Sequence, residues 1–171
     1  ADAWLAERFA SAREGAPVQE LPVIYFCLWL YRLAWSDTEA ICRRLKVTAV
    51  TIRVLQQIPH VKARLPALGE SAKPSAVVSV LDGCVVATLS VVALAEADAG
   101  VRENIRRYRD EFRRVKPTIC GADLRALGVR PGPEFGRVLG RLRAAWLDGE
   151  VSSSEEEVDL LRELLKVETE Q

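Results

Sequence analysis

The chain has 171 residues, 49% of them hydrophobic and only 6% aromatic, and its 24 basic and 24 acidic side chains cancel to no net charge. This apolar content excludes disorder of the whole chain, and the abundance of alanine, leucine, arginine and glutamate argues against a β-sandwich or a barrel. We therefore expect an all-α fold of roughly eight to ten helices, a multi-helix body followed by a tail.

Three helices are predicted in the first third of the chain. Residues 22–34 begin with a proline and are apolar nearly all round, which is typical of a helix in the middle of a bundle. A capping box of Ser36 and Glu39 predicts a second helix over 36–46. A threonine cap predicts a third helix over 48–58, which ends before the next proline.

The middle of the chain contains one ambiguous segment between two clearer helices. Pro74 predicts a helix over 74–81, which the following Asp-Gly pair breaks. Residues 84–97 are β-branched at first and rich in alanine and leucine afterwards. Because no other segment alternates well enough to pair with a strand, we predict a buried helix here. Residues 100–115 resume helical periodicity, with an apolar stripe of Val101, Ile105, Tyr108 and Phe112.

Three further helices are predicted in the last third, near 122–127, over 133–148 and near 154–166. The first is short and follows a Lys-Pro pair. The second begins at a proline and ends before a glycine. The third has two alternative capping boxes, Ser152 with Glu155 and Ser154 with Glu157.

The chain divides most simply into a helical body over 1–97 and a helical tail over 98–171, with one continuous domain as the alternative. Its longest apolar run, 84–95, is far shorter than the roughly 20 residues that a membrane span needs, so we expect no transmembrane helix and no membrane partner. The N-terminus lacks the basic-then-apolar order of a signal peptide. It begins as though cut from a longer chain.

Four cysteines and one histidine predict neither a disulfide framework nor a zinc site. No two cysteines have Cys-x-x-Cys spacing, and His60 has no partner at ligand spacing in the sequence. We expect a reduced cytoplasmic protein in which the cysteines act as small buried hydrophobic side chains, at positions Cys27, Cys42, Cys84 and Cys120.

The zero net charge conceals an uneven distribution. Residues 1–99 contain ten basic and ten acidic side chains, and residues 100–147 contain twelve basic and five acidic ones, a surplus of seven positive charges. Residues 148–171 contain two basic and nine acidic side chains, a surplus of seven negative charges. The basic block predicts a surface that faces a polyanion, and the acidic block predicts a solvated tail.

Four arginines in the basic block follow a 4, 3, 4 spacing and therefore share one face of a helix: Arg102, Arg106, Arg109 and Arg113. Such a row either faces a ligand or is a solvated face relieved by acids. Within this row Arg106 has acids three and four residues away, Glu103 and Asp110, and we expect a net positive strip to remain.

A second basic group follows the stretch LGVRPGP, in which one helix ends and another begins within a few residues. Pro133 suits the first position of the new helix, where a missing N–H has no cost. The free backbone N–H groups of residues 134–136 form an intrinsic anion site, flanked by Arg130 before it and Arg137 after it.

The helix that starts at Pro133 combines a basic face with two glycines. Arg137 and Arg141 lie one turn apart, away from an apolar stripe of Val138, Leu142 and Trp146. Gly136 and Gly140 each weaken a helix by roughly 1 kcal/mol relative to alanine. We expect either another helix or the backbone of a ligand to approach closely at this seam.

The chain lacks a catalytic constellation. It contains no Gly-Ser or Asp-x-Asp motif for nucleotide and metal, no phosphate-binding loop, no nucleophile elbow and no plausible Cys-His pair. We therefore expect the chain on its own to perform no chemistry.

Residues 116–164 resemble the C-terminal region of bacterial class II tRNA nucleotidyltransferases, the CCA-adding or A-adding enzymes, and of their poly(A) polymerase relatives. The family pattern runs from a Thr-Gly-x-Asp-Leu segment through Leu-Gly, Pro-Gly-Pro and Gly-x-x-Leu to Leu-Asp-Gly-Glu before a last helix. The matching residues are Asp123, Leu124, Leu127, Gly128, Pro131, Gly132, Pro133, Gly136, Leu139, Leu147, Asp148, Gly149 and Glu150.

This resemblance implies an all-helical body and tail that hold the acceptor and T arms of tRNA while a separate N-terminal head adds nucleotides. The motifs that bind magnesium and nucleoside triphosphate belong to that head, so neither cofactor is expected on this chain. The parent protein is expected to be a nucleotidyltransferase, and its choice among CCA, A and poly(A) addition is expected to reside in the head.

The expected partners are tRNA, the head in the same polypeptide and, as an option, a second copy of the chain. The residues assigned to RNA binding are Arg102, Arg106, Arg109, Arg113, Arg130, Gly132, Gly136, Arg137 and Arg141. The alternative function is a helical protein-interaction or dimerisation module that binds protein through the Gly136–Gly140 seam and the terminal acidic helix. A third possible function is DNA binding by a module of the helix-hairpin-helix kind.

Overall fold

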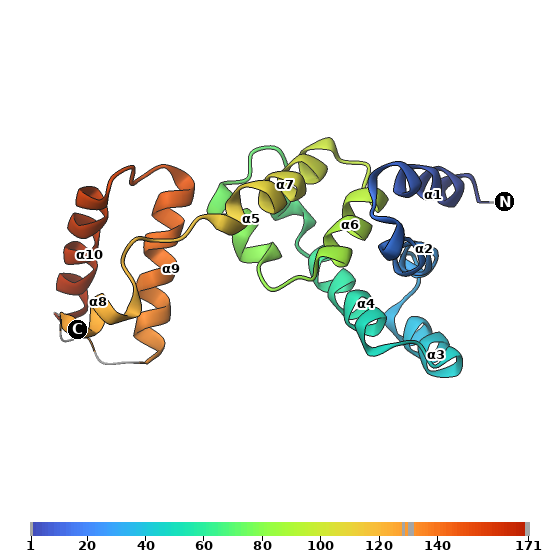
Figure 1. Cartoon of the computed structure of the whole chain (residues 1–171), viewed down its shortest axis with the longest axis horizontal. Helices are drawn as coiled ribbons and strands as arrows, with labels where there is room; N and C mark the ends of the chain where they lie inside the picture. The colour runs from blue at the N-terminus through green and yellow to red at the C-terminus, as the bar shows by residue number, and fades with distance from the viewer. Residues whose placement is uncertain (1, 128, 130–131, 170–171) are drawn as a thin grey trace.

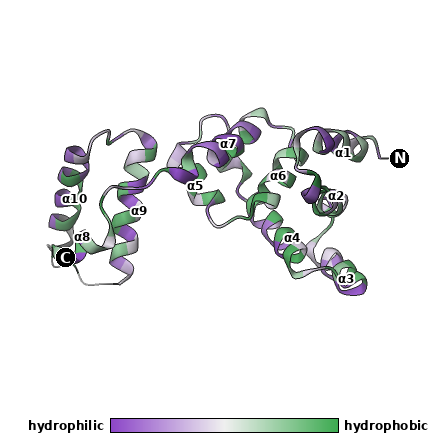
Figure 2. Cartoon of the chain, viewed as in Figure 1, coloured by the Kyte–Doolittle hydropathy of each residue, from purple (hydrophilic) through white to green (hydrophobic). Residues whose placement is uncertain are grey.

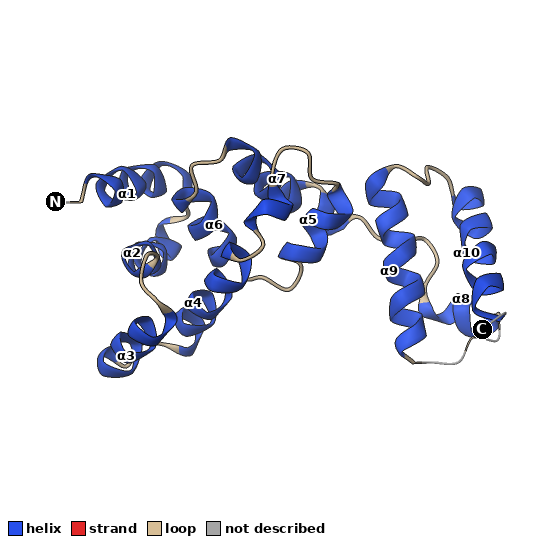
Figure 3. Cartoon of the chain, turned by 180° about the vertical axis from the view of Figure 1, so that it is seen from behind, coloured by secondary structure: helices blue, strands red, loops and turns tan. Residues whose placement is uncertain are grey.

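The computed structural model describes residues 2–127, 129 and 132–169. These residues form helices and loops without a strand (Figure 3), which confirms the predicted all-α fold. Figure 1 shows an elongated molecule whose last three helices lie at the end opposite the N-terminus. The α-helices are α1 (Ala3–Gly15), α2 (Leu21–Leu30), α3 (Trp35–Leu45), α4 (Ala49–Lys62), α5 (Pro74–Leu81), α6 (Val86–Ala95), α7 (Ala99–Asp110), α8 (Gly121–Ala126), α9 (Pro133–Asp148) and α10 (Ser154–Thr169), and the 3-10 helices are η1 (Val18–Glu20), η2 (Leu65–Leu68) and η3 (Phe112–Arg114).

Helices α1 to α7 enclose the larger of two hydrophobic cores. Its fully buried side chains include Ile24, Val54, Leu81 and Val91, from α2, α4, α5 and α6. Figure 2 shows the hydrophobic ribbon of α6 in the middle of this unit. The buried helix predicted over 84–97 is confirmed as α6, whose apolar side chains are buried on several sides.

No single helix in the described ranges is long and apolar enough to cross a membrane. Helices α5 and α6 reach that length and hydropathy only as a pair, and they are bent by 114° at the break between them.

The first two helices differ from the prediction at their ends. Helix α1 has no counterpart among the predicted helices, although Asp2 caps it by accepting a hydrogen bond from the backbone N–H of Trp4 at 3.1 Å. Helix α2 ends at Leu30 rather than at Ala34, because the chain turns directly after it.

The predicted capping box of Ser36 and Glu39 is wrong. Helix α3 begins at Trp35, so Ser36 already lies inside its first turn, and no side chain caps the helix at Ala34. The earlier start brings the indole of Trp35 against the larger core, which the polar pattern alone does not reveal.

Helix α4 starts as predicted and ends later. The Oγ1 atom of Thr48 accepts a hydrogen bond from the backbone N–H of Thr51 at 3.4 Å. The predicted end before Pro59 is wrong, because α4 continues to its end at residue 62. A proline inside a helix removes one backbone hydrogen bond, but Ile58 and Val61 beside it are buried in the core, and their burial offsets that loss.

Helix α7 lies tightly against the loop that follows η2. A Cβ atom at Gly100 would come within 2.6 Å of the backbone nitrogen of Glu70, so only glycine fits there. The Nδ2 atom of Asn104 donates hydrogen bonds to the carbonyls of residues 68 and 69, at 3.1 and 2.8 Å. The α-helix ends before the predicted range of 100–115 does, and the chain continues as η3.

Helices α8, α9 and α10 enclose a second core, formed by Ile119, Leu124, Val138, Leu142 and Leu161. Helix α9 has the predicted bounds. Neither predicted capping box starts α10, because the Oγ atom of Ser153 accepts the hydrogen bond from the backbone N–H of Glu156 at 3.2 Å. Glu157, a member of one predicted box, is instead buried.

Helix α9 belongs to both groups of helices. Val138 and Leu142 face the second core, whereas Leu147 packs against the larger core and α5 lies beside the helix. Phe112 is still part of the larger core, so the change from one core to the other comes after η3. The predicted division of the chain into a body over 1–97 and a tail over 98–171 stays a prediction.

Candidate nucleic-acid interface

The structure divides the predicted row of arginines into members with partners and members without. The guanidinium of Arg102 turns to the C-terminal end of α6, where Nη1 donates to the carbonyls of Glu96 at 3.1 Å and Ala97 at 2.9 Å. These contacts satisfy carbonyl groups at a helix end. Arg102 therefore stabilises the fold and is less available to a ligand.

Arg106 is the second member with partners. Its Nη2 lies 2.6 Å from the carboxylate of Glu103, and its Nη1 lies 3.3 Å from that of Asp110. The hydrogen bond from Arg106 holds the pKa of Glu103 below its ordinary value. Exposed pairs of this kind contribute little to stability, but they neutralise the arginine. Of the two alternatives for the arginine row, a solvated face whose charge is relieved by acids fits Arg106.

The other two members remain unneutralised. Arg109 and Arg113 are exposed and make no side-chain ion pair or hydrogen bond with the part of the chain that the structure describes. The same holds for Arg114 and Lys116, which the spacing argument does not select because they lie off the predicted face. We call Arg109, Arg113, Arg114 and Lys116 the η3 cluster. Its sequence signal is the basic run that directly precedes Pro117.

A second basic surface lies on α9. Arg137 and Arg141 are both exposed, one turn apart, on the side of the helix that faces neither core. Arg141 pairs with Glu150 at 2.5 Å, an exposed contact that a competing phosphate can replace. Gly136 and Gly140 each directly precede one of these arginines, and we call the four residues the Gly-Arg face.

The two glycines of the Gly-Arg face have open space beside them. A Cβ atom built at Gly136 or at Gly140 would meet no atom within 4 Å among the described residues. Tight packing of another helix, one of the two expectations for this seam, is therefore not found within the described part of the chain. The approach of a ligand backbone stays a prediction.

The turn before α9 is described only in part. Gly132 precedes the helix, Pro133 is its first residue as predicted, and no side chain caps its N-terminus. Arg130, together with Gly128 and Pro131, lies outside the described residues. The role of Arg130 beside the helix N-terminus therefore stays a prediction.

The Leu-Asp-Gly-Glu motif joins the two units. Asp148 accepts hydrogen bonds from the backbone N–H and the hydroxyl of Ser75, at 2.9 and 2.6 Å, and so caps α5. Arg143, five residues earlier on α9, donates to the carboxylate of Asp82 at 2.8 Å and to the carbonyl of Val115 at 3.0 Å. These contacts fix α9 against both ends of α5.

The next two residues of the motif are also structural. Gly149 has a φ of 72°, the left-handed conformation that ends α9. Glu150 pairs with Arg141 and so places an acid beside the Gly-Arg face. The resemblance at this motif therefore reports on the joint between the units more than on a contact with RNA.

The cysteines differ in their environments. Cys27 and Cys42 are buried as predicted, and burial raises the pKa of the Cys27 thiol to about 12. Cys84 is half-buried. Cys120 corrects the prediction, because it is exposed. Its sulfur accepts the backbone N–H of Asp123, whose carboxylate accepts the backbone N–H of Cys120 at 2.8 Å, so the cysteine caps α8 where the family pattern has threonine.

The described residues do not bring three histidine, cysteine, aspartate or glutamate side chains together in an arrangement that could hold a metal ion. Magnesium stays an expectation for another part of the protein.

Comparison with known proteins gives one relevant similarity. The chain is 27% identical over 143 residues to an A-adding tRNA nucleotidyltransferase of Geobacter sulfurreducens (strain ATCC 51573 / DSM 12127 / PCA). The similarity supports a tRNA nucleotidyltransferase-related family. It covers 80% of this chain and 16% of that protein, so the chain spans only a small part of its relative's length. No family model matches the chain, and no solved structure is significantly similar to it.

Proposed function

We propose that the chain is a tRNA-binding part of a tRNA nucleotidyltransferase or a related poly(A) polymerase. In this proposal it positions the acceptor and T arms in the cytoplasm, and a head in the same polypeptide adds nucleotides to the 3′ end. Magnesium and nucleoside triphosphate belong to that head.

The observation that supports this function best is the Gly-Arg face. Two glycines inside one helix cost roughly 1 kcal/mol each relative to alanine, and no neighbour within the described residues packs against either of them. Within the described residues the fold gives no close-packing reason for them, although Gly140 lines a hollow of about 410 Å³ between α5 and α9. A phosphate backbone that approaches the helix surface supplies such a reason, because the missing side chains let it come close to the adjacent guanidinium groups.

The chemistry of both basic surfaces suits shape recognition. Arginines that contact phosphates bind without reading the base sequence, which a protein that serves many tRNAs requires. The η3 cluster adds four cations without partners in the described ranges. We expect contacts mainly to phosphate and ribose, and affinity that falls steeply with salt.

Alanine substitution of the two glycines tests the proposal. Gly136→Ala and Gly140→Ala should each stabilise the chain by roughly 0.5–1 kcal/mol, since alanine favours the helix and the new methyl group meets no atom. Both should weaken tRNA binding, because the methyl group occupies the space that the ligand backbone needs. Urea denaturation measures the first effect, and filter binding over a range of salt concentrations measures the second.

Gly15→Ala is a matched control, since Gly15 ends α1 and also has nothing within 4 Å of its added Cβ. It should leave tRNA affinity unchanged. If the α9 variants are more stable but bind tRNA as tightly as the wild type, the Gly-Arg face is not part of the RNA surface.

A protein-interaction module remains the second candidate because of a hollow of about 540 Å³ between α8 and α10. Leu127 and Val158 line it, and both are exposed. Apolar docking there would change little with salt, whereas tRNA binding should weaken steeply. The salt titration therefore separates the two functions.

A further inference from the structure

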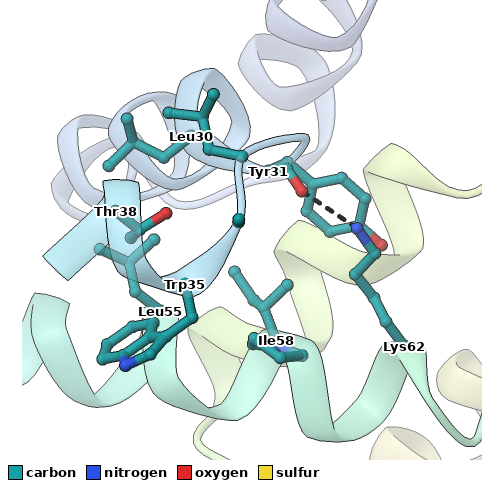
Figure 4. A pocket seen from close by; sticks show the side chains of 10 residues that line it. Leu30, Tyr31, Trp35, Thr38, Leu55, Ile58 and Lys62 are labelled. Atoms are coloured by element: carbon teal, nitrogen blue, oxygen red, sulfur yellow. Dashed lines mark hydrogen bonds between the residues drawn. The ribbon is translucent and has the colours of Figure 1, made fainter.

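A pocket of about 290 Å³ lies where the end of α2, the start of α3 and the second half of α4 meet. Figure 4 shows its lining, which includes Tyr31, Trp35, Thr38, Leu55, Ile58 and Lys62. None of these residues belongs to the two basic surfaces described above. We call this space the α2–α4 pocket.

The hydroxyl of Thr38 is a polar group that opens onto this pocket. Thr38 is only 4% exposed, and its Oγ1 makes no hydrogen bond with the residues that the structure describes. Figure 4 shows this hydroxyl pointing into the space that the labelled side chains enclose. A hydroxyl that faces a pocket can donate a hydrogen bond to a ligand there.

Two further donors lie around the same pocket. No side chain caps α3, so the N–H groups of its first turn, which begins at Trp35, have no side-chain acceptor. The ammonium group of Lys62 donates to the carbonyl of Tyr31 at 3.1 Å and lies 4.5 Å from the centre of its ring. A lysine has three N–H donors, so this contact leaves two for a ligand.

The remaining walls are apolar. The side chains of Leu55 and Ile58 form one side, and the indole of Trp35 forms an edge (Figure 4). Such a wall suits a flat ring, whereas the helix N-terminus, the hydroxyl and the ammonium group suit an anion. The volume is near the lower end of ligand pockets, roughly 300–1,000 Å³, and admits one small molecule of this kind.

We propose that the α2–α4 pocket binds a single nucleotide, with its phosphate at Thr38, Lys62 and the start of α3 and its base against the apolar wall. The choice of a nucleotide over other aromatic anions rests on the proposed function. The shared chemistry is a nucleoside monophosphate, which either an unstacked residue of an RNA strand or a free mononucleotide can supply.

The test is a titration of the full chain with AMP, inorganic phosphate, a short single-stranded RNA and tRNA, followed by amide NMR signals. AMP should shift the signals of residues 34–38 and 58–62 with saturation, and inorganic phosphate should do so more weakly. Thr38→Val removes only the unpaired hydroxyl and should keep the fold. Thr38→Val and Lys62→Gln should each weaken AMP binding by about tenfold. Lys73→Gln changes an exposed lysine outside the pocket and is the control, which should leave AMP binding unchanged.

The outcomes separate this site from the proposed function. Pocket signals that move with both AMP and RNA identify an RNA residue as the occupant, and signals that move with AMP alone identify a free mononucleotide. If tRNA binds but neither AMP nor RNA moves the pocket signals, the pocket proposal fails and the proposed function stands. If AMP binds in the pocket and tRNA does not bind at all, the proposed function fails and the pocket stands. AMP affinity that is unchanged in Thr38→Val and Lys62→Gln overturns the assigned contacts.

Discussion

At the scale of single residues, the buried carboxylate of Glu157 ties α10 to the loop before α8. The side chain is fully buried, and its oxygens accept the backbone N–H groups of Thr118 at 3.1 Å and Ile119 at 3.2 Å. Burial alone raises the pKa of such a group, but these hydrogen bonds outweigh it and hold the pKa of Glu157 below its ordinary value of 4.5. The native state therefore favours the charged carboxylate.

Glu157→Gln should destabilise the chain by about 1–3 kcal/mol at pH 7, because the amide presents an N–H₂ group where the backbone needs an acceptor. A group whose native pKa is lowered contributes stability above its unfolded pKa and loses it as the pH falls through the native value. The difference in unfolding free energy between wild type and variant should therefore shrink below pH 4.5. Urea denaturation at a series of pH values measures it.

Glu155→Gln is the matched control, since Glu155 lies in the same first turn of α10 but is exposed. It should change the unfolding free energy by less than about 1 kcal/mol, the size of an exposed charge effect at a helix N-terminus. A difference for Glu157→Gln that stays constant from pH 7 down to pH 3 would contradict the role given to the charged carboxylate.

At the scale of elements, α5 depends on a cap from a distant part of the chain. The residue before it is Lys73, which offers no side-chain cap, and Asp148 from α9 accepts the N–H of Ser75 instead. The same carboxylate accepts the hydroxyl of Ser75. One side chain thus stabilises the start of α5 and holds α9 beside it.

Asp148→Ala should therefore lower the free energy of unfolding by about 1–2 kcal/mol, the upper range for loss of a helix cap. Asp148→Asn keeps one acceptor and should have a smaller effect. Hydrogen exchange at the amides of Val77 and Val78 should speed up in the alanine variant. The exposed Asp159, which pairs only with Arg162 within the described residues, gives the control Asp159→Ala, with an expected loss of less than about 1 kcal/mol. Equal effects of the two alanine variants would refute the capping role of Asp148.

Local signals explain which helices could be predicted. A proline at the first position and a glycine after the end gave α9 its bounds, and an apolar run gave α6. Caps were predicted poorly, because serine with glutamate three residues later occurs several times and only packing selects among the registers. Pro59 was misleading for a related reason, since burial around it is a tertiary property.

At the scale of the whole molecule, contacts between elements decide which arginines are engaged by the fold and which stay exposed without a partner in the described residues. The spacing predicts that Arg102 and Arg109 share one helix face, but the carbonyls that engage Arg102 follow the end of α6. Arg143 is likewise engaged by Asp82, 61 residues away in the sequence. The sequence could therefore predict that the candidate site is a basic surface. Which arginines belong to that surface depends on contacts between elements that the sequence pattern does not reveal.

Removal of positive charge tests whether the η3 cluster and the Gly-Arg face bind the same RNA. Arg109→Gln with Arg113→Gln removes two cations of the η3 cluster, and Arg137→Gln with Arg141→Gln removes those of the Gly-Arg face. Each double variant should weaken the binding of several tRNAs alike and flatten the log–log salt dependence by about one unit per lost phosphate contact. The four-residue variant should show the sum of both slope changes if one tRNA contacts both surfaces.

The control is a double variant of two exposed arginines outside both surfaces, Arg13→Gln on α1 with Arg53→Gln on α4. It removes the same charge and should have little effect on tRNA binding. A double variant that folds and keeps the wild-type affinity and salt slope removes its surface from the RNA interface, and slope changes no larger than those of the control pair would show that only the overall charge matters.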